Sequence, residues 1–360
     1  MPFAETPLLN TLCAQVRGAM GLPVSVDTRS VDGDLVDFAL YRHRVGPLLH
    51  KAVENSANGK TEAAHLERLA ESYRHNGREV LRQKAVSEKL TRLMADHSIA
   101  CHFLKGHQLG QQIYTDPIVR TSKDVDILIA PERAAETVEI LQDAGFVWRD
   151  GPRNAKATRP RKDILRRIET FKDFTFRDPE HGVEIETHHR MFFIEPGDFS
   201  GDFARRRDLP RVPLVEDEHY LLYLILHGAL VYWRRLKWVV DLSTIVRTVE
   251  NETVLAALDL SGRYGCAAAV LSSLAFVEEL FPGSLGENLG GVLRDRGSGR
   301  RHAELLEKYR HYCASSSEGN RRSPMRRPRF ENPERLIFHG QINVVESYTR
   351  RIKAAVLARS

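Results

Sequence analysis

Two aspartates, Asp124 and Asp126, stand two positions apart at the start of the short apolar segment DVDILI, residues 124–129. Because successive side chains of a β-strand point to opposite faces, both aspartates would share one face of a strand, and the apolar side chains would share the other. Paired carboxylates are suitable ligands for a hard divalent cation such as Mg²⁺. The spacing therefore predicts a strand with one face for a cation and one for a core.

A second feature precedes these aspartates. Lys105 and Gly106 stand between an apolar run, residues 99–104, and a helix-like segment, residues 107–114. A strand that enters a helix through glycine presents backbone N–H groups and the positive end of the helix dipole, which together suit a phosphate. Mg²⁺ typically binds one or two carboxylates together with phosphate oxygens and water, so the two features together predict a metal–nucleotide reaction.

At these residues the chain resembles the bacterial nucleotidyltransferases of the DNA polymerase β superfamily. The resemblance is to a poorly characterised branch in which Lys-Gly stands where many relatives have Gly-Gly or Gly-Ser. It covers roughly residues 40 to 245. The residues that carry it are the run LKG, Tyr114, Asp116-Pro117, Arg120, DVDILI, Pro131, Gly145-Phe146, Glu186-Thr187-His188, His227 and the run LKWVVD at 236–241.

The resemblance implies an α+β fold, with a polymerase β-like nucleotidyltransferase core built on a small mixed sheet and flanked by N- and C-terminal helical segments. It implies attack of an acceptor hydroxyl or phosphate oxygen on the α-phosphorus of an NTP, with release of pyrophosphate and with Mg²⁺ or Mn²⁺ as cofactor. Asp124 and Asp126 would be catalytic residues that hold two metal ions, one activating the nucleophile and one neutralising the triphosphate.

The resemblance also implies which residues contact the nucleotide. Lys105, Gly106 and Arg120 would steady the phosphates. Ser122 and Lys123 are expected in a turn that sets the strand, and they are counted among the candidate nucleotide-binding residues.

A hairpin is expected to supply a third carboxylate. Residues 171–176 alternate as a strand, the sequence DPEHG makes a turn, and residues 183–188 return as the partner strand. Glu184, Glu186 and His188 would share a face of that strand, and the spacing alone allows either glutamate in the metal site. The family pattern of an acid two residues before a histidine implies Glu186, as catalytic residue and metal ligand, with Glu184 nearer the turn and solvated.

The length of 360 residues, with 42% hydrophobic and 28% charged residues, is typical of a globular protein with room for two domains. We expect a helical region at 1–98, the catalytic core at 99–215, a helical domain at 216–291 and a basic region at 292–360. Apolar residues at three-to-four spacing predict helices over 37–53 and 61–97, and a helical pair over 216–249.

Four cysteines lie far apart and form no CxxC pair, which argues against a zinc ribbon or a disulfide framework and fits a reducing cytosol. The N-terminus lacks a basic segment followed by an apolar one. The most apolar helix candidate, residues 221–231, is shorter than the roughly 20 residues that span a bilayer. We therefore expect a cytoplasmic protein without a membrane partner.

Two segments are strongly basic. Residues 149–172 carry nine Lys or Arg against three acids, and they form either a solvated surface or a flap over an anionic substrate. Residues 292–360 have a net charge of +9, while the rest of the chain has −4. The C-terminal segment has the charge for nucleic acid but no recognition motif, so nucleic acid is not the favoured partner.

Other catalytic motifs are missing from the sequence, which has no P-loop, no GxGxxG and no GxSxG. His102, His107, His188 and His189 do not have the spacing of a zinc motif. Two alternatives stay open beside nucleotidyl transfer: a nucleotide-binding pseudoenzyme or adaptor, and a phosphotransferase that moves the γ-phosphate. The sequence does not name the acceptor, which could be a small molecule, a peptide, a protein or an RNA end.

Overall fold

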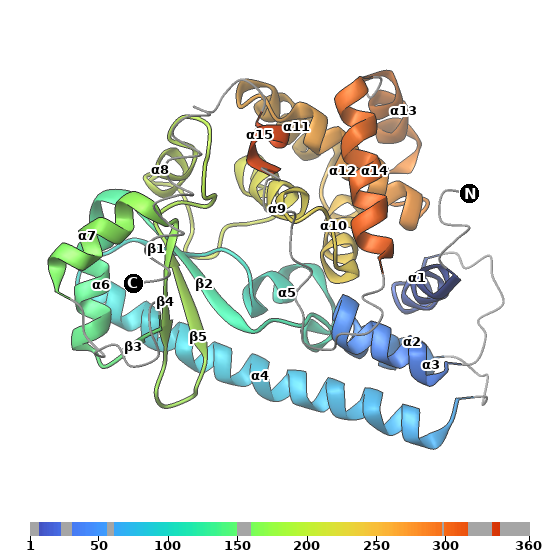
Figure 1. Ribbon diagram of the computed structural model, residues 1–360, viewed down its shortest axis with the longest axis horizontal. Coiled ribbons are helices and arrows are strands. Elements are labelled where there is room, and N and C mark those ends of the chain that lie inside the picture. Colours follow the sequence, from blue (N-terminus) through green and yellow to red (C-terminus); the bar gives the residue numbers. More distant parts are fainter. Residues whose placement is uncertain are drawn as a thin grey trace. The chain divides into compact units, whose positions relative to one another are not determined.

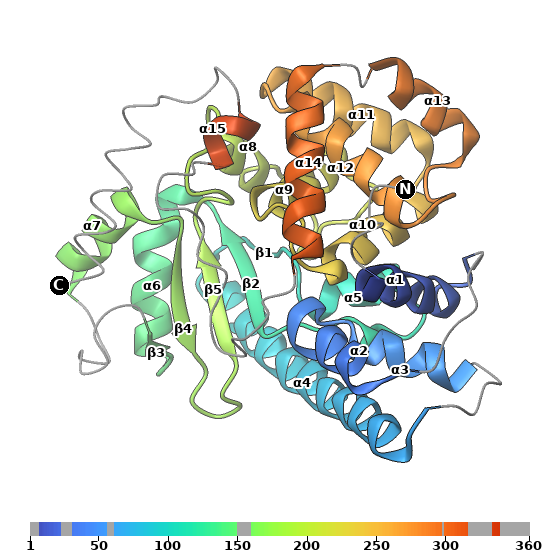
Figure 2. The same cartoon turned by 45° about the vertical axis from the view of Figure 1, so that its right-hand side comes forward.

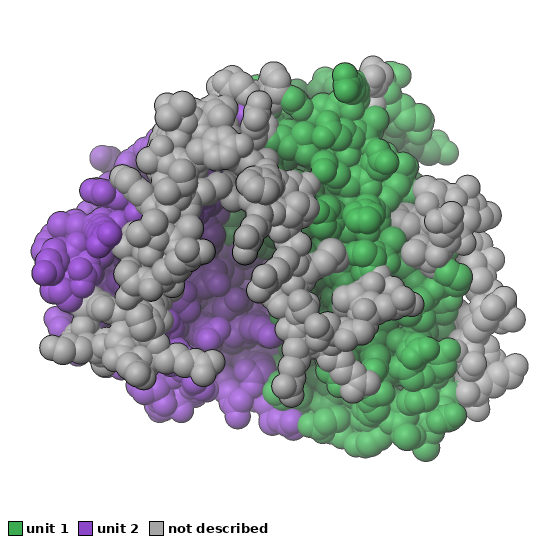
Figure 3. Space-filling model, in the orientation of Figure 1, with its two compact units in different colours: residues 1–77, 113–121, 215–337 green, residues 78–112, 122–214, 338–360 purple. Residues whose placement is uncertain are grey.

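The computed structural model describes residues 7–22, 31–55, 61–149, 160–296, 299–315 and 333–338. The chain forms two compact units, which Figure 3 colours separately. Unit 1 comprises residues 1–77, 113–121 and 215–337, and unit 2 comprises residues 78–112, 122–214 and 338–360. Residues 113–121, called the strap below, thus belong to unit 1, although the chain on both sides of them belongs to unit 2.

Unit 2 is built on a five-stranded sheet with the strand order β1-β2-β5-β4-β3 (Figure 1). Its strands are β1 (Cys101–Phe103), β2 (Asp124–Ile129), β3 (Val147–Trp148), β4 (Asp173–Arg177) and β5 (Glu184–His188). Strands β2 and β5 run parallel, and the other neighbours are antiparallel. The predicted α+β class with a small mixed sheet is confirmed.

One face of this sheet forms the core of unit 2. The apolar side chains of β2, Val125, Ile127 and Ile129, are at most 1% exposed. They belong to a cluster with residues from the C-terminal half of α4 (Ala63–Asp96), from α6 (Ala134–Asp143) and from α7 (Arg161–Thr170). Figure 2 shows α6 beside the strands. The period-two pattern of DVDILI thus gives an apolar face that packs on helices and leaves its aspartates on the other face.

The hairpin of β4 and β5 closes through the predicted turn. The Asp178 carboxylate accepts from the backbone N–H of His181 at 2.7 Å, and Gly182 takes a left-handed φ of 70°. Lys89 donates to the same carboxylate at 2.7 Å. Asp178, Glu180 and His181 lie close enough to hold a metal ion, but the turn and the lysine already account for the position of Asp178.

Unit 1 is helical in its described residues. Its first helices are α1 (Pro7–Ala19), α2 (Gly33–Asp37), a π-helix (Phe38–His43), α3 (Gly46–Asn55) and the first half of α4. Unit 2 also contains α5 (His107–Ile113), up to residue 112, and α8 (Phe199–Ala204). After unit 2 the chain returns to unit 1 and forms α9 (Glu218–Leu230), α10 (Leu236–Thr248), α11 (Asn251–Arg263), α12 (Ala267–Leu280), α13 (Gly286–Arg296), α14 (Arg300–Ala314) and α15 (Pro333–Ile337). The predicted helical pair over 216–249 is confirmed as α9 and α10.

The strap is held inside unit 1 by polar contacts. Asp241 of α10 accepts from the Tyr114 hydroxyl at 2.9 Å and from Arg120 Nε at 3.0 Å. Asn76 of α4 donates to the Arg120 carbonyl at 3.1 Å, and Lys237 of α10 donates to the Thr121 carbonyl at 3.0 Å. These bonds fix the backbone that leads into β2.

Several expectations fall on residues that the structure does not describe. Residues 150–159 of the first basic segment, and 316–332 and 339–360 of the second, lie outside the described ranges. The division into four regions, with boundaries at 98, 215 and 291, stays a prediction. Within the described part of the chain, none of the helices has both the length and the apolar composition that crossing a membrane requires. All four cysteines are buried and unpaired.

Candidate functional site

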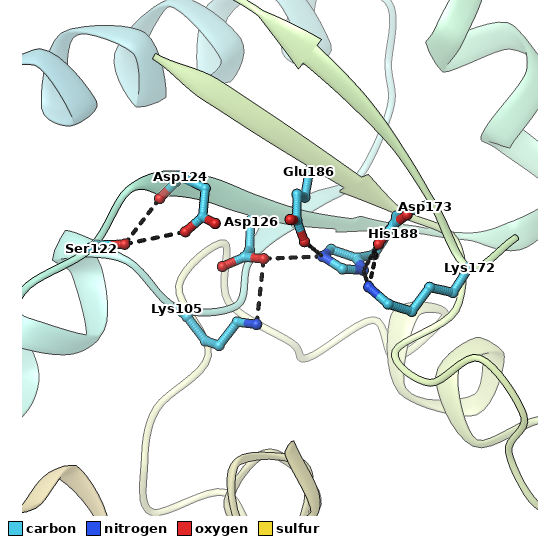
Figure 4. A network of polar contacts seen from close by, with 8 residues as sticks. All are labelled: Lys105, Ser122, Asp124, Asp126, Lys172, Asp173, Glu186 and His188. Atoms are coloured by element: carbon cyan, nitrogen blue, oxygen red, sulfur yellow. Dashed lines mark hydrogen bonds and ion pairs between the residues drawn. The ribbon is translucent and has the colours of Figure 1, made fainter. Parts of the chain in front are cut away.

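The register of two parallel strands brings four acidic residues to one face of the sheet. Asp124 of β2 lies opposite Glu184 of β5, and Asp126 lies opposite Glu186. Side chains at paired positions of neighbouring strands point to the same face. Figure 4 shows the carboxylates of Asp124 and Asp126 on one side of β2. The predicted shared face is therefore present, and β5 adds its own acids to it.

Three residues of this face form a tight group. One potential ligand atom from each of Asp126, Glu186 and His188 lies within 4.8 Å of the other two. His188 Nε2 is 3.0 Å from Asp126 Oδ1 and 3.4 Å from Glu186 Oε2. Asp126 and His188 are buried, whereas the Glu186 side chain is 34% exposed. The group is therefore open on the Glu186 side, where a bound ion would meet solvent.

Asp124 stands outside this tight group. Its carboxylate accepts from the Ser122 hydroxyl at 3.4 Å, and the same hydroxyl is 3.2 Å from its backbone carbonyl. The residue is partly exposed. In the structure, the potential ligands that lie together are Asp126, Glu186 and His188. The sequence predicts a different set, the three carboxylates of Asp124, Asp126 and Glu186. The role of Asp124 as a metal ligand stays a prediction.

His188 is oriented from its other ring nitrogen. Its Nδ1 lies 3.3 Å from Lys172 Nζ and 3.7 Å from Asp173 Oδ2 (Figure 4). Burial lowers the pKa of His188, but the carboxylates of Asp126, Glu186 and Asp173 outweigh burial and raise it above its ordinary value. With a lysine beside Nδ1, the Nε2 nitrogen carries a proton and donates to the Asp126 carboxylate. His188 therefore holds that carboxylate in place.

Asp173 and Lys172 complete the polar group. Burial raises the pKa of Asp173, but the positive charges of Lys172 and His188 outweigh burial and lower it. Lys172 forms an ion pair with Asp173, its neighbour in the chain. Sequence reasoning did not select either residue. The hairpin pattern could have identified Asp173, because counting residues back from the turn places Asp173 opposite His188.

Lys105 and Gly106 lie at the turn between β1 and α5, as predicted. Lys105 Nζ is 3.4 Å from Asp126 Oδ1, so its positive charge meets the acidic face. Gly106 has a left-handed φ of 73°, and a Cβ atom there would lie 3.3 Å from the Asp124 carbonyl oxygen. Glycine is therefore favoured here, because a side chain would be strained at this φ and would crowd β2. Contact of either residue with a phosphate stays a prediction.

The remaining sequence candidates differ in their surroundings. Lys123 and Glu184 are exposed, and the exposure of Glu184 confirms its predicted solvation. Arg120 is 5% exposed and forms a buried ion pair with Asp241 in unit 1. This pair gives Arg120 a structural role in holding the strap, and it does not support the predicted contact with phosphate.

The charges on this face are unequal. Its carboxylates are those of Asp124, Asp126, Asp173, Glu184 and Glu186, and its nearby cations are Lys105 and Lys172. Carboxylate oxygens suit Mg²⁺ and Mn²⁺ alike. The donor set therefore fits a divalent cation that supplies the missing positive charge.

A family model described as an uncharacterised nucleotidyltransferase matches residues 30–282. No curated protein and no solved structure matches the chain. The matched range includes the acidic face of β2 and β5, the Lys-Gly turn, the strap and the helices α9 to α12.

Proposed function

The chain belongs to this family of nucleotidyltransferases and is thus a transferase, and we propose that it moves an NMP group from an NTP to an acceptor at the acidic face of unit 2. The observation that carries the proposal is the group of Asp126, Glu186 and His188, with ligand atoms within 4.8 Å of one another. The oxygen of the acceptor attacks the α-phosphorus, the bond to the bridging oxygen of the β-phosphate breaks, and pyrophosphate leaves.

The proposed metal ligands are Asp124, Asp126 and Glu186. Bound Mg²⁺ or Mn²⁺ supplies Lewis acidity for the attacking oxygen and neutralises charge on the leaving pyrophosphate. Glu186 is partly exposed and, unlike Asp124, lies in the tight group with Asp126, so it is placed to accept the proton of the acceptor. His188 keeps the Asp126 carboxylate oriented through its Nε2–H.

The proposed nucleotide contacts are Lys105, Gly106, Ser122 and Lys123. Lys105 is supported by its place 3.4 Å from Asp126, where its amine can bridge a carboxylate and a phosphate. Ser122 is supported by its bond to Asp124, and exposed Lys123 by its adjacency to both. We leave Arg120 out of this set because its guanidinium is buried against Asp241.

Two labelled nucleotides test the reaction class. The protein is incubated in lysate with Mg²⁺ and an NTP labelled at either the α- or the γ-phosphate, and labelled products are identified by mass. We expect α-label on an acceptor and γ-label in pyrophosphate. Transfer of the γ-label would instead establish a phosphotransferase, and binding of nucleotide without transfer of either label would establish a pseudoenzyme.

The control for this experiment is a pair of variants on the same face. Asp126→Asn removes a buried candidate ligand, and Glu184→Gln removes an exposed acid of the neighbouring strand. Labelling that persists with Asp126→Asn would place the activity elsewhere. The acceptor and the choice of NTP follow from the labelled product, and the cytoplasmic location stays a prediction.

A further inference from the structure

A cavity of about 360 Å³ lies within unit 1. Its lining comes from the C-terminal end of α1, from α3, from the strap and from the C-terminal half of α10. Cavities of this size are at the lower end of the range that binds small molecules in proteins. None of the residues of the acidic face lines it.

The floor of the cavity is apolar. Leu48 of α3 and Ile113 and Val119 of the strap line it, and each is at most 6% exposed. Met20 adds a flexible apolar side chain from the end of α1. This part of the cavity suits a hydrocarbon or aromatic group, because its walls offer dispersion contacts and few polar partners.

The rim carries an excess of positive charge. Arg247 is exposed, and its described contact is a long one, 3.5 Å, to the neutral carbonyl of Met20. Among the described residues, Arg247 has no carboxylate within ion-pair distance. Lys51, also in the lining, lies 3.1 Å from Glu54, so its charge is already largely offset.

The single acid of the lining is occupied by other contacts. The Asp116 carboxylate accepts from the Tyr73 hydroxyl at 2.7 Å and from the backbone N–H of Ile118 at 3.1 Å, and it lies 4.0 Å from Lys51. Arg247 therefore stands as the cation of the rim that an anionic group would meet. The hydroxyl of Thr115 at the same rim can donate to such a group.

The polarity of the cavity also limits the class of ligand. A nucleoside triphosphate carries several negative charges, which one arginine and one paired lysine would not neutralise. A molecule with one carboxylate, sulfonate or phosphate group and an apolar body matches an apolar floor below Arg247, which no described carboxylate neutralises.

We propose that this cavity binds a small organic anion with an apolar body, at a site that shares no residue with the acidic face of unit 2. The anionic group lies against Arg247, and the apolar body lies on Leu48, Ile113 and Val119. Such a ligand contacts the strap, which continues along the chain into Ser122 and β2.

The probe for this proposal is the fluorescent anion anilinonaphthalene sulfonate, titrated onto the full-length protein with saturating Mg²⁺-ATP present. We expect saturable binding of about one probe per chain that ATP does not displace. Arg247→Glu should weaken probe affinity at least about tenfold, because it reverses the charge that meets the sulfonate. Thr248→Trp, at an exposed position, should weaken it as much by filling the rim.

The matched control is Arg263→Glu, which makes the same charge change at an exposed arginine of α11 in the same unit. It should leave probe affinity within about twofold of wild type, a difference below 0.5 kcal/mol at 1.4 kcal/mol per tenfold. Equal affinities for Arg247→Glu and Arg263→Glu, no effect of Thr248→Trp, or displacement of the probe by ATP would each overturn the proposal. Binding is measured without turnover, so this outcome is independent of the proposed reaction.

Discussion

Each unit of the molecule contains a buried aspartate with several polar partners, and the surroundings of the two aspartates differ. Asp241 in unit 1 is 6% exposed and binds Arg120 and Tyr114 of the strap. Asp126 in unit 2 is 4% exposed and binds His188 and Lys105. Burial alone therefore does not distinguish a carboxylate held by structural partners from one in a candidate metal site.

The difference lies in the charge around each aspartate. Asp241 has one guanidinium and one hydroxyl as partners. Burial and then the charge of Asp241 hold the pKa of Tyr114 well above its ordinary value, so that the phenol remains a neutral donor. This group is complete without a ligand. The group of Asp126 contains a second, partly exposed carboxylate in Glu186, with further acids beside it, and this excess of carboxylates fits a divalent cation.

The comparison shows what each unit contributes to the segment formed by the strap and β2. The Asp241 group fixes the strap, and the strap ends at Thr121, three positions before Asp124. Unit 1 thus holds the backbone that enters β2, and unit 2 supplies the acidic face. The first group should affect stability most, and the second should affect catalysis most.

The largest expected effect is on stability. Asp241→Asn leaves the buried Arg120 charge without its counterion, and the free energy of unfolding should fall by about 3–5 kcal/mol in urea denaturation. A double variant, Arg120→Met with Asp241→Leu, should recover much of this loss because it removes both charges. Asp126→Asn should cost less, since Glu186 remains beside His188. Equal losses of unfolding free energy for Asp241→Asn and Asp126→Asn would contradict the difference assigned to the two aspartates.

The next effect is on the chemical step. Glu186→Gln should lower the single-turnover rate by at least about 10²-fold, the low end of what a positioned acid or base contributes. Glu184→Gln, the exposed neighbour two positions away, should change it by less than about tenfold. Rates are measured at saturating metal and NTP. A larger loss at Glu184 would show that the wrong glutamate of β5 has been assigned.

A smaller effect separates nucleotide binding from metal binding. Lys105→Ala should weaken NTP affinity by about tenfold, the loss of one charge-assisted contact. Metal affinity should not fall, because the lysine competes with a metal ion for the Asp126 carboxylate. Calorimetric titrations with NTP and with Mn²⁺ measure the two affinities. Unchanged NTP affinity would give Lys105 a structural role.

The smallest expected effect is on the pH dependence of stability, and it comes from the buried carboxyl group of Glu195. Glu195 accepts from the Ser200 hydroxyl at 2.6 Å, and among the described residues it has no cation partner. Burial raises its pKa from 4.5 to about 7. The folded state therefore binds a proton that the unfolded state has lost, so the contribution of this group is complete below pH 4.5 and is lost as the pH rises through about 7.

The variant Glu195→Gln isolates this contribution. The stability of wild type relative to Glu195→Gln should fall by on the order of 1 kcal/mol between pH 5 and pH 8. Urea denaturation at the two pH values measures it. A difference that stays constant with pH, or that grows toward pH 8, would contradict the protonated state of Glu195.

Local patterns predicted the strands that carry the site. The alternation of DVDILI placed Asp124 and Asp126 on the face opposite the core, and the turn sequence DPEHG placed the hairpin. Both inferences depend on neighbours within a few residues, where side-chain period and turn chemistry decide the structure. The same period put His188 on the face of Glu186, although its bond to Asp126 needed the parallel register of β2 and β5.

Long-range pairing was beyond the sequence. Arg120 was predicted to bind phosphate from its position in the family pattern, yet its ion pair is with Asp241, 121 residues later. No local period or turn signal reports such a contact, because it arises when α10 packs on the strap. The assignment of residues 113–121 to unit 1 has the same origin.

The most direct test of the central claim is metal binding by the acidic face. Mn²⁺ is titrated onto the wild type, Asp126→Asn and Glu184→Gln, and free Mn²⁺ is measured by its paramagnetic resonance signal. The account predicts that Asp126→Asn weakens Mn²⁺ affinity at least about tenfold, while Glu184→Gln leaves it within about twofold. The same Mn²⁺ affinity in wild type and Asp126→Asn would contradict a metal site at this face.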